Sequence, residues 1–451
     1  MDDLFDAVPI PRLVLRLGLP AMLAQAFNIL YSVVDRIFVG HLPGTGSLAL
    51  AGLGVCAPAL TAVTAFASLV GIGGAAVLSL SMGARDHRTA RQAMSTSLAL
   101  LIGLSVILAA VLFAAARPLL YLLGCSDAIW PYAGRYFRLY VLGTPAALIG
   151  SGMNAFLLAQ GQARRGMLSV TIGALLNTAL DPLFLFVLDL GVAGAALATV
   201  LAQCCVMGYV LRQLRRPALP YPLRPARPSG PIVRRILAIG CLPFFIVLLD
   251  NLLIIPLDAS LQHWGGPELG DKLLSCAAVV QSFMLLAYCP AQGITSGCAT
   301  LYGYHFGAGH YEKVLQVFRW VLIVCLVYLS ALCLFSQTAP EQFARLFCQD
   351  EALVPLAAAC IRRYAAGLPG VAVQYALVDG LTAMGRTRSA LPISFFRKGL
   401  YVLLVLVLPL LRPVEDLFWC AALSDLIGAS VTAVVFLCAV RPRLAREMGR
   451  T

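Results

Sequence analysis

Apolar residues occupy the chain in long blocks, separated by short stretches that carry most of the charged side chains. A helix needs about 20 mostly apolar residues to cross a membrane. By that measure the pattern predicts twelve membrane-spanning helices, centred near residues 25, 65, 105, 145, 175, 202, 245, 288, 325, 370, 402 and 428. The predicted fold is therefore all-α and integral to a membrane. The first block has no small-residue cleavage site, so we interpret it as a retained helix rather than as a signal peptide.

A stretch rich in proline and arginine divides the chain near its middle. Six prolines lie between residues 215 and 231. Because proline lacks a backbone N–H and breaks helices, this stretch is expected to be an extended, solvated linker on the cytoplasmic side. We therefore predict a six-helix N-terminal lobe over residues 1–214, a linker over 215–230 and a six-helix C-terminal lobe over 231–451.

The two halves match each other at a constant offset of 224 residues. The matching positions include Gly73 with Gly297, Gly83 with Gly307, Arg138 with Arg362, Tyr140 with Tyr364, Pro145 with Pro369 and Arg164 with Arg388. Because each half has six spans, both would run through the membrane in the same sense, as a parallel repeat. Transporters built in this way hold their ligand near the membrane midplane, and access alternates as the halves rock.

Composition and charge narrow the class of protein. A hydrophobic content of 60%, a charged content of 12% and a mean hydropathy of +0.87 exclude a soluble globular enzyme. The net charge of +12 at first suggests a nucleic-acid partner. However, 24 of the 33 Lys and Arg residues lie on one side of the membrane if the helices alternate. The positive-inside rule then places both termini in the cytoplasm, which agrees with an even number of spans. We therefore expect a bilayer rather than a nucleic acid as the partner.

Two carboxylates lie within apolar blocks. Asp35 and Asp181 each have apolar neighbours on both sides, and a carboxylate at the centre of a membrane helix costs about 2.5–3.5 kcal/mol. Asn177 lies four residues before Asp181, hence on the same helix face. Pro182 cannot donate to the carbonyl of Thr178, which leaves that oxygen free. Such a set of oxygens suits a hard cation, or the two carboxylates could share one proton. Asp189, by contrast, is expected to face water near a helix end.

Several motifs, taken in order, resemble the multidrug and toxic compound extrusion (MATE) family over almost the whole chain. They are Tyr31–Gly40, Gly83–Asp86, Ala159–Ala163, Asn177–Phe184 and Gly191–Thr199. The fourth and fifth are typical of the prokaryotic branch whose cation site is placed in the N-terminal lobe. The resemblance implies a site for Na⁺ or H⁺ coupling, with Na⁺ held at Asp35 and Asp181, and no organic cofactor. Its members would be Asp35, Asn154, Asn177, Asp181 and Thr199.

The C-terminal half also contains polar candidates within its apolar blocks. Asp250 and Asp379 could form a second site, since another branch of the family is thought to bind its coupling cation in that lobe. The alternative is that they face water near helix ends. Arg397 and Lys398 are expected to extend to the lipid headgroups. Candidates for an adaptable substrate cavity are Gln25, Tyr31, Gln281, Met284, Tyr288 and Gln374.

We therefore interpret the chain as a secondary antiporter of the inner or plasma membrane. It would export amphipathic organic compounds, expected to be cations, in exchange for inward Na⁺ or H⁺, and function as a monomer because one chain holds both lobes. The alternative is a lipid-linked glycan flippase of the same superfamily. A flippase would need an arginine-rich cavity, whereas the charge within the predicted spans is mainly acidic. An enzyme is not expected, because no HExxH-like, His/Asp or Ser/Lys set lies at membrane depth.

Overall fold

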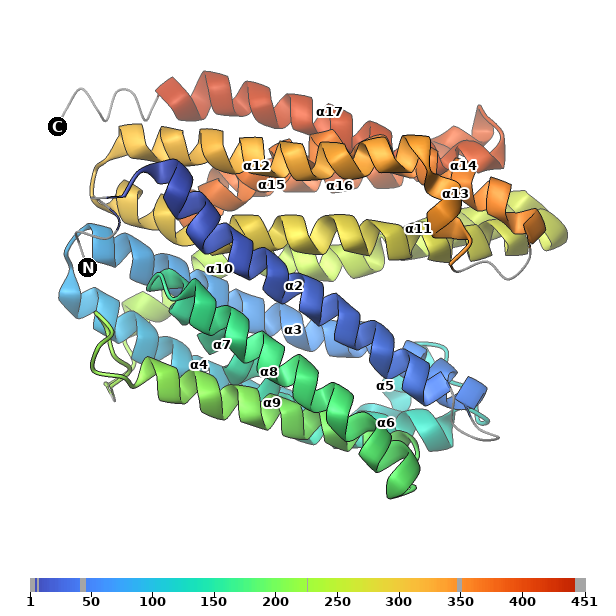
Figure 1. Cartoon of the computed structure of the whole chain (residues 1–451), viewed down its shortest axis with the longest axis horizontal. Coiled ribbons are helices and arrows are strands. Elements are labelled where there is room, and N and C mark those ends of the chain that lie inside the picture. Colours follow the sequence, from blue (N-terminus) through green and yellow to red (C-terminus); the bar gives the residue numbers. More distant parts are fainter. Residues whose placement is uncertain (1–4, 6–7, 41–45, 225, 347–350, 443–451) are drawn as a thin grey trace. The chain divides into compact units, whose positions relative to one another are not determined.

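The computed structural model describes residues 5, 8–40, 46–224, 226–346 and 351–442, and it is drawn in Figure 1. Over these residues the chain is helical almost throughout, and none of them lies in a β-strand. Long apolar blocks without strand-like alternation thus form helices, as the hydrophobic pattern predicts.

The helices of the first half follow one another through short connections. They are α2 (Ile10–Gly40), α3 (Gly46–Gly83), α4 (His87–Ala114), α5 (Ala116–Leu122), α6 (Trp130–Leu142), α7 (Thr144–Ala159), α8 (Ala163–Pro182), the π-helical turn η1 (Leu183–Val187) and α9 (Val192–Leu214).

The second half follows the same order. It contains α10 (Gly230–Leu252), α11 (Ile254–Gly307), α12 (Tyr311–Thr338), α13 (Pro340–Ala344), η2 (Glu351–Leu353), α14 (Val354–Ala365), α15 (Leu368–Ala383), α16 (Thr387–Val407), η3 (Leu408–Leu410), η4 (Val414–Phe418), α17 (Trp419–Val435) and η5 (Phe436–Val440). The long α11 is broken at Gly266, whose φ of 66° lies in the left-handed region that glycine adopts without strain.

The number of spans agrees with the repeat. Among the described residues, ten helices are long and apolar enough to cross a membrane, and α6 with α7, bent by 54°, would form an eleventh span. An offset of 224 residues superimposes the bounds of α7 on those of α15 and the bounds of α4 on those of α12. The same offset places α6 on α14, so α14 and α15 occupy the position of the twelfth span.

Contacts divide the chain into two compact units, and each border lies inside a helix. Unit 1 comprises Leu23–Leu248, and unit 2 comprises Asp2–Met22 together with Leu249–Thr451. The borders therefore lie in α2 and α10, away from the predicted linker at residues 215–230. The first helix of each half contributes to both units, which the predicted lobes 1–214 and 231–451 do not include.

Small residues explain why the borders lie there. In unit 2, a Cβ added at Gly297 would lie 2.6 Å from the Leu17 carbonyl oxygen, so α11 touches the backbone of α2. In unit 1, a Cβ added at Gly240 would lie 1.8 Å from the Leu69 carbonyl oxygen, so α10 touches the backbone of α3. Backbones approach this closely only where side chains are absent.

The proline-rich segment is extended, but the expectation that it is solvated throughout was wrong. Leu219, Tyr221 and Leu223 are buried, at alternate positions along the segment. The Tyr221 backbone N–H donates to Gln160 Oε1 at 3.1 Å, and its hydroxyl lies 2.6 Å from His87 Nδ1. Apolar side chains on one face of an extended segment thus pack onto unit 1 while prolines and arginines occupy the other face.

Tyr221 is expected to fasten this segment by its ring more than by its hydroxyl. Tyr221→Ala should lower the free energy of unfolding by about 3–5 kcal/mol, because it empties a buried ring position. Tyr221→Phe keeps the ring and should cost only about 0.5–1.5 kcal/mol. Thermal unfolding of the purified variants in detergent measures both, and equal losses would show that the hydroxyl is what matters.

Candidate functional site

The centre of the candidate site is a hydrogen-bonded set on α8 and α9. Asn177 and Asp181 are buried on the same face of α8. Asn177 Nδ2 donates to Asp181 Oδ1 at 3.2 Å and lies 3.4 Å from Thr199 Oγ1 on α9. The Thr199 hydroxyl in turn donates to the Ala195 carbonyl at 3.0 Å. The spacing of four residues on α8 therefore brings an amide and a carboxylate together, as predicted.

Local sequence explains why α8 and α9 present these groups to each other. Directly after Pro182, α8 widens into the π-helical turn η1, where proline cannot supply the next regular hydrogen bond. A Cβ added at Gly194 would lie 2.8 Å from the Phe184 backbone, so α9 packs directly on η1. This close approach sets the register that places Thr199 beside Asn177.

Asp35 joins the set from α2. Its carboxyl lies beside that of Asp181, in hydrogen-bond contact, and its charge also acts on the Tyr140 hydroxyl of α6. Gln203 Nε2 donates to that hydroxyl at 3.1 Å. The structure therefore brings Asp35, Asp181 and Asn177 together, with Thr199 adjoining.

Tyr140 and Gln203 are members that the sequence interpretation missed. Gln203 lies four residues after Thr199, on the same face of α9, and this spacing could have identified it. Tyr140 is one of the positions that match between the two halves of the chain. Its role was not separable from that of other repeated residues without knowing which residues α6 faces.

The donor and acceptor balance tests whether a cation fits. Three buried oxygens have no hydrogen-bond partner within the part of the chain that the structure describes: Asn177 Oδ1, Asp181 Oδ2 and Gln203 Oε1. Buried acceptors normally have a donor or an ion. Carboxylate and amide oxygens are what a hard cation prefers, and two adjacent carboxyls also favour sharing a proton. The residues present thus suit Na⁺ or H⁺.

Asn154 lies on α7 and has a different partner. The Ser169 hydroxyl of α8 donates to Asn154 Oδ1 at 3.1 Å. This contact ties α7 to α8, so the hydrogen bond that the structure gives Asn154 links helices. Its predicted place among the coupling residues stays a prediction.

Comparison with known proteins identifies the class. The family model described as MatE matches residues 20–183 and 264–407, which is more than half of the chain. The chain belongs to the MATE family. It is 22% identical over 443 residues to the multidrug export protein MepA of Staphylococcus haemolyticus, covering 98% of this chain and 96% of that protein. MepA of Staphylococcus aureus is 21% identical over 447 residues, with the same coverage.

A solved structure agrees in fold. An outward-facing multidrug resistance MATE family transporter of the MOP superfamily superimposes with a TM-score of 0.90, at 21% identity and with 98% of each chain covered. MATE structures have twelve helices in two bundles, so the predicted fold class is confirmed. Members of the MATE family are transporters, and the expectation that the chain is not an enzyme is confirmed with it.

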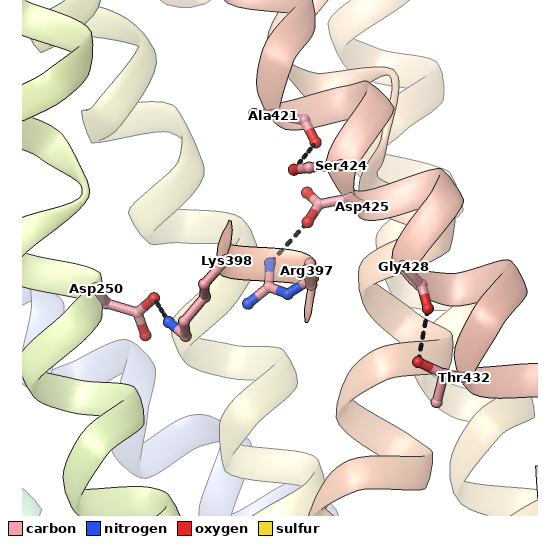
Figure 2. Close-up of polar contacts among 8 residues, drawn as sticks. All are labelled: Asp250, Arg397, Lys398, Ala421, Ser424, Asp425, Gly428 and Thr432. Carbon is pink, nitrogen blue, oxygen red and sulfur yellow. Dashed lines mark hydrogen bonds and ion pairs between the residues drawn. The ribbon is translucent and has the colours of Figure 1, made fainter. Parts of the chain in front are cut away.

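The acids in unit 2 of this MATE transporter have separate partners. Asp379 on α15 accepts a hydrogen bond from the Thr295 hydroxyl at 2.6 Å. Asp250 on α10 is ion-paired with Lys398 on α16. Asp425 on α17 accepts from Arg397 Nη1 at 2.7 Å. Figure 2 shows the two basic side chains pointing from α16 towards these two acids.

The expectation that Arg397 and Lys398 extend to the lipid headgroups was therefore wrong. Lys398 is buried and Arg397 half-buried, and each has an acid on a neighbouring helix. Long basic side chains reach for the membrane surface when nothing neutralises them at depth. In this transporter Asp250 and Asp425 neutralise them, and one sequence alone does not show which helices are neighbours.

The predicted cavity residues are spread over three helices. Gln25 lies half-buried on α2, and the side chain of Tyr31 lies outside the described residues. The remaining four belong to unit 2, and the Tyr288 ring packs against that of Tyr375 with centroids 6.2 Å apart. They are Gln281, Met284 and Tyr288 on α11 and Gln374 on α15.

Proposed function

We propose that this transporter is a secondary active antiporter that exports amphipathic organic compounds, chiefly cations, in exchange for inward Na⁺ or H⁺. The proposal is supported chiefly by Asp35 and Asp181, two acids from different helices in contact beside buried oxygens that lack a partner. Intramembrane acids of this kind are typical of ion and proton paths. The names of the MepA relatives support multidrug export as the class of transport.

The ion gradient supplies the driving force in this proposal. One elementary charge that moves inward releases about 2.3 kcal/mol per 100 mV. Since about 1.4 kcal/mol corresponds to a tenfold ratio, this supports a substrate gradient of roughly fifty-fold.

The contact between Asp35 and Asp181 suggests how the ion would act on the fold. Two adjacent carboxylates repel each other when both are charged, and a bound Na⁺ or a shared proton removes that repulsion. Ion binding would therefore draw α2 towards α8. Because α2 belongs to both units, its bending or closure would contract the cavity of the first unit and release substrate outward.

The proposed setting is the plasma membrane, with both termini in the cytoplasm and one chain as the working unit. The distribution of Lys and Arg supports this orientation. The glycan flippase is less well supported, because both basic residues of the unit 2 cluster are paired with acids. A pyrophosphate ligand would need positive charge in excess.

Everted membrane vesicles test the proposed function. Uptake of the cationic dye ethidium is measured by fluorescence while a Na⁺ or a H⁺ gradient is imposed separately. We expect uptake under one of the two gradients and none when that gradient is collapsed with an ionophore. Vesicles that lack the protein serve as the control, and uptake that is equal in both preparations would refute the proposal.

Gln203 is expected to tune the affinity for the coupling ion. Gln203→Leu keeps the side-chain size but removes the unpartnered oxygen and the donor to Tyr140. It should raise the ion concentration for half-maximal transport roughly tenfold, since one polar contact in a buried site is worth about 1–3 kcal/mol. Gln213→Leu, the same change ten residues further along α9, should leave that concentration unchanged. Equal shifts in both variants would exclude a local role for Gln203.

A further inference from the structure

Four charged side chains meet inside unit 2, away from the acids of the coupling site. They come from three helices: Asp250 on α10, Arg397 and Lys398 on α16, and Asp425 on α17 (Figure 2). Arg397 and Lys398 lie near the middle of the span Thr387–Leu410, and Asp425 near the middle of Val414–Val440. Isolated charges at such depth are costly, and these four sum to zero.

The two pairs differ in accessibility. The Asp425 side chain is 3% exposed and is held by Arg397 at 2.7 Å, so this pair is closed. In the other pair the Lys398 side chain is 4% exposed, whereas that of Asp250 is 54% exposed. A cation is thus fixed inside, and its anionic partner is the accessible member. Asp250 can turn away at little cost, but Lys398 then needs another anion in its place.

A third donor lies beside these cations. Gln374 on α15 is 3% exposed, and within the described part of the chain its Nε2 has no hydrogen-bond partner. A Cβ added at Gly428 would lie 2.8 Å from that nitrogen and 3.0 Å from Arg397 Cγ, so the amide borders the Arg397 side chain. Ammonium, guanidinium and amide N–H groups together are the donors that a carboxylate accepts from.

We propose that this cluster binds zwitterionic substrates, those that carry a carboxylate as well as a cationic group. The substrate carboxylate replaces Asp250 beside Lys398 and accepts from Gln374, and the released Asp250 holds the substrate cation. A plain cation at Asp250 would leave Lys398 buried without an anion. A plain anion at Lys398 would leave Asp250 without a cation, whereas a zwitterion keeps the charges balanced. The inference rests on the proposed export function and names a substrate class for it.

A matched pair of dyes tests this. Tetramethylrhodamine with a free carboxylate is a zwitterion, and its methyl ester is a cation of nearly the same size. Binding of each dye to the purified protein in detergent is measured by fluorescence anisotropy. We expect the free acid to bind at least tenfold more tightly than the ester. In the charge-neutral variant Asp250→Asn/Lys398→Met, acid binding should weaken about tenfold and the ratio should approach one.

Two further variants keep the test decisive. Gln374→Leu leaves both ion pairs in place and should weaken acid binding several-fold without changing ester binding. Lys272→Met, the same change at an exposed position of unit 2, should alter neither. An acid-to-ester ratio that stays at the wild-type value in both cluster variants, or a loss that is equal for both dyes, would overturn the proposal. Failure of gradient-driven export in wild-type vesicles would refute the antiport function instead, and it would not change the binding ratio.

Discussion

Asp35→Asn and Asp181→Asn are each expected to reduce gradient-driven dye uptake to the level of vesicles without the protein. Each change keeps the shape of the side chain and removes one of the two adjacent charges. A single remaining carboxylate no longer experiences the repulsion that ion binding relieves, so substrate movement loses its link to the gradient. Initial rates of ethidium uptake in everted vesicles, corrected for the amount of protein, measure the effect.

Asp189→Asn provides the matched control. Asp189 is exposed, between η1 and α9, and has a φ of 50°, a conformation that asparagine also tolerates. The same chemical change there should leave uptake within about twofold of wild type, which corresponds to less than about 0.5 kcal/mol. Full activity in both site variants would move the coupling to the acids of unit 2, Asp250 or Asp379.

Gly240→Ala is expected to prevent stable folding of unit 1. An added methyl carbon would lie 1.8 Å from the Leu69 carbonyl oxygen and 2.7 Å from its carbonyl carbon, both of which are backbone atoms. A flexible side chain could move aside, but a helix backbone cannot, so α10 must separate from α3. Overpacking of a rigid contact costs typically 1–3 kcal/mol and more when no rotamer relieves it. We expect a cost of at least about 3 kcal/mol, measured as a loss of monodisperse protein and a lower thermal midpoint.

Gly103→Ala is the control for this prediction. Gly103 lies within α4, and nothing comes within 4 Å of a Cβ added there. Alanine should therefore be neutral or stabilising by up to about 1 kcal/mol, through its higher helix propensity. If Gly240→Ala has the same unfolding midpoint as Gly103→Ala, the close contact of α10 with α3 would be refuted.

The parts of the fold that depend on local pattern could be predicted from the sequence. Apolar blocks and the offset of 224 residues identified the helices and their repetition, and α7 and α15 coincide at that offset. The pairing of Asn177 with Asp181 follows from a spacing of four on one helix. These features depend on residues close together in the chain, which helix geometry relates directly.

The parts that depend on which helices are neighbours could not be predicted. The pairing of Lys398 with Asp250 joins positions 148 residues apart, and the contact of Gln203 with Tyr140 joins positions 63 apart. The buried face of Leu219, Tyr221 and Leu223 likewise depends on the surface that unit 1 presents. Prolines in that segment exclude a helix but leave its packing open.

Ion movement that accompanies substrate movement tests the central claim most directly. Purified protein is placed in liposomes that contain a Na⁺-sensitive and a pH-sensitive dye, and a gradient of a cationic substrate is applied with no ion gradient present. We predict that Na⁺ or H⁺ moves in the opposite direction in the wild-type protein and that neither moves with Asp181→Asn. Substrate movement in the wild type with no movement of either ion would contradict antiport through Asp35 and Asp181.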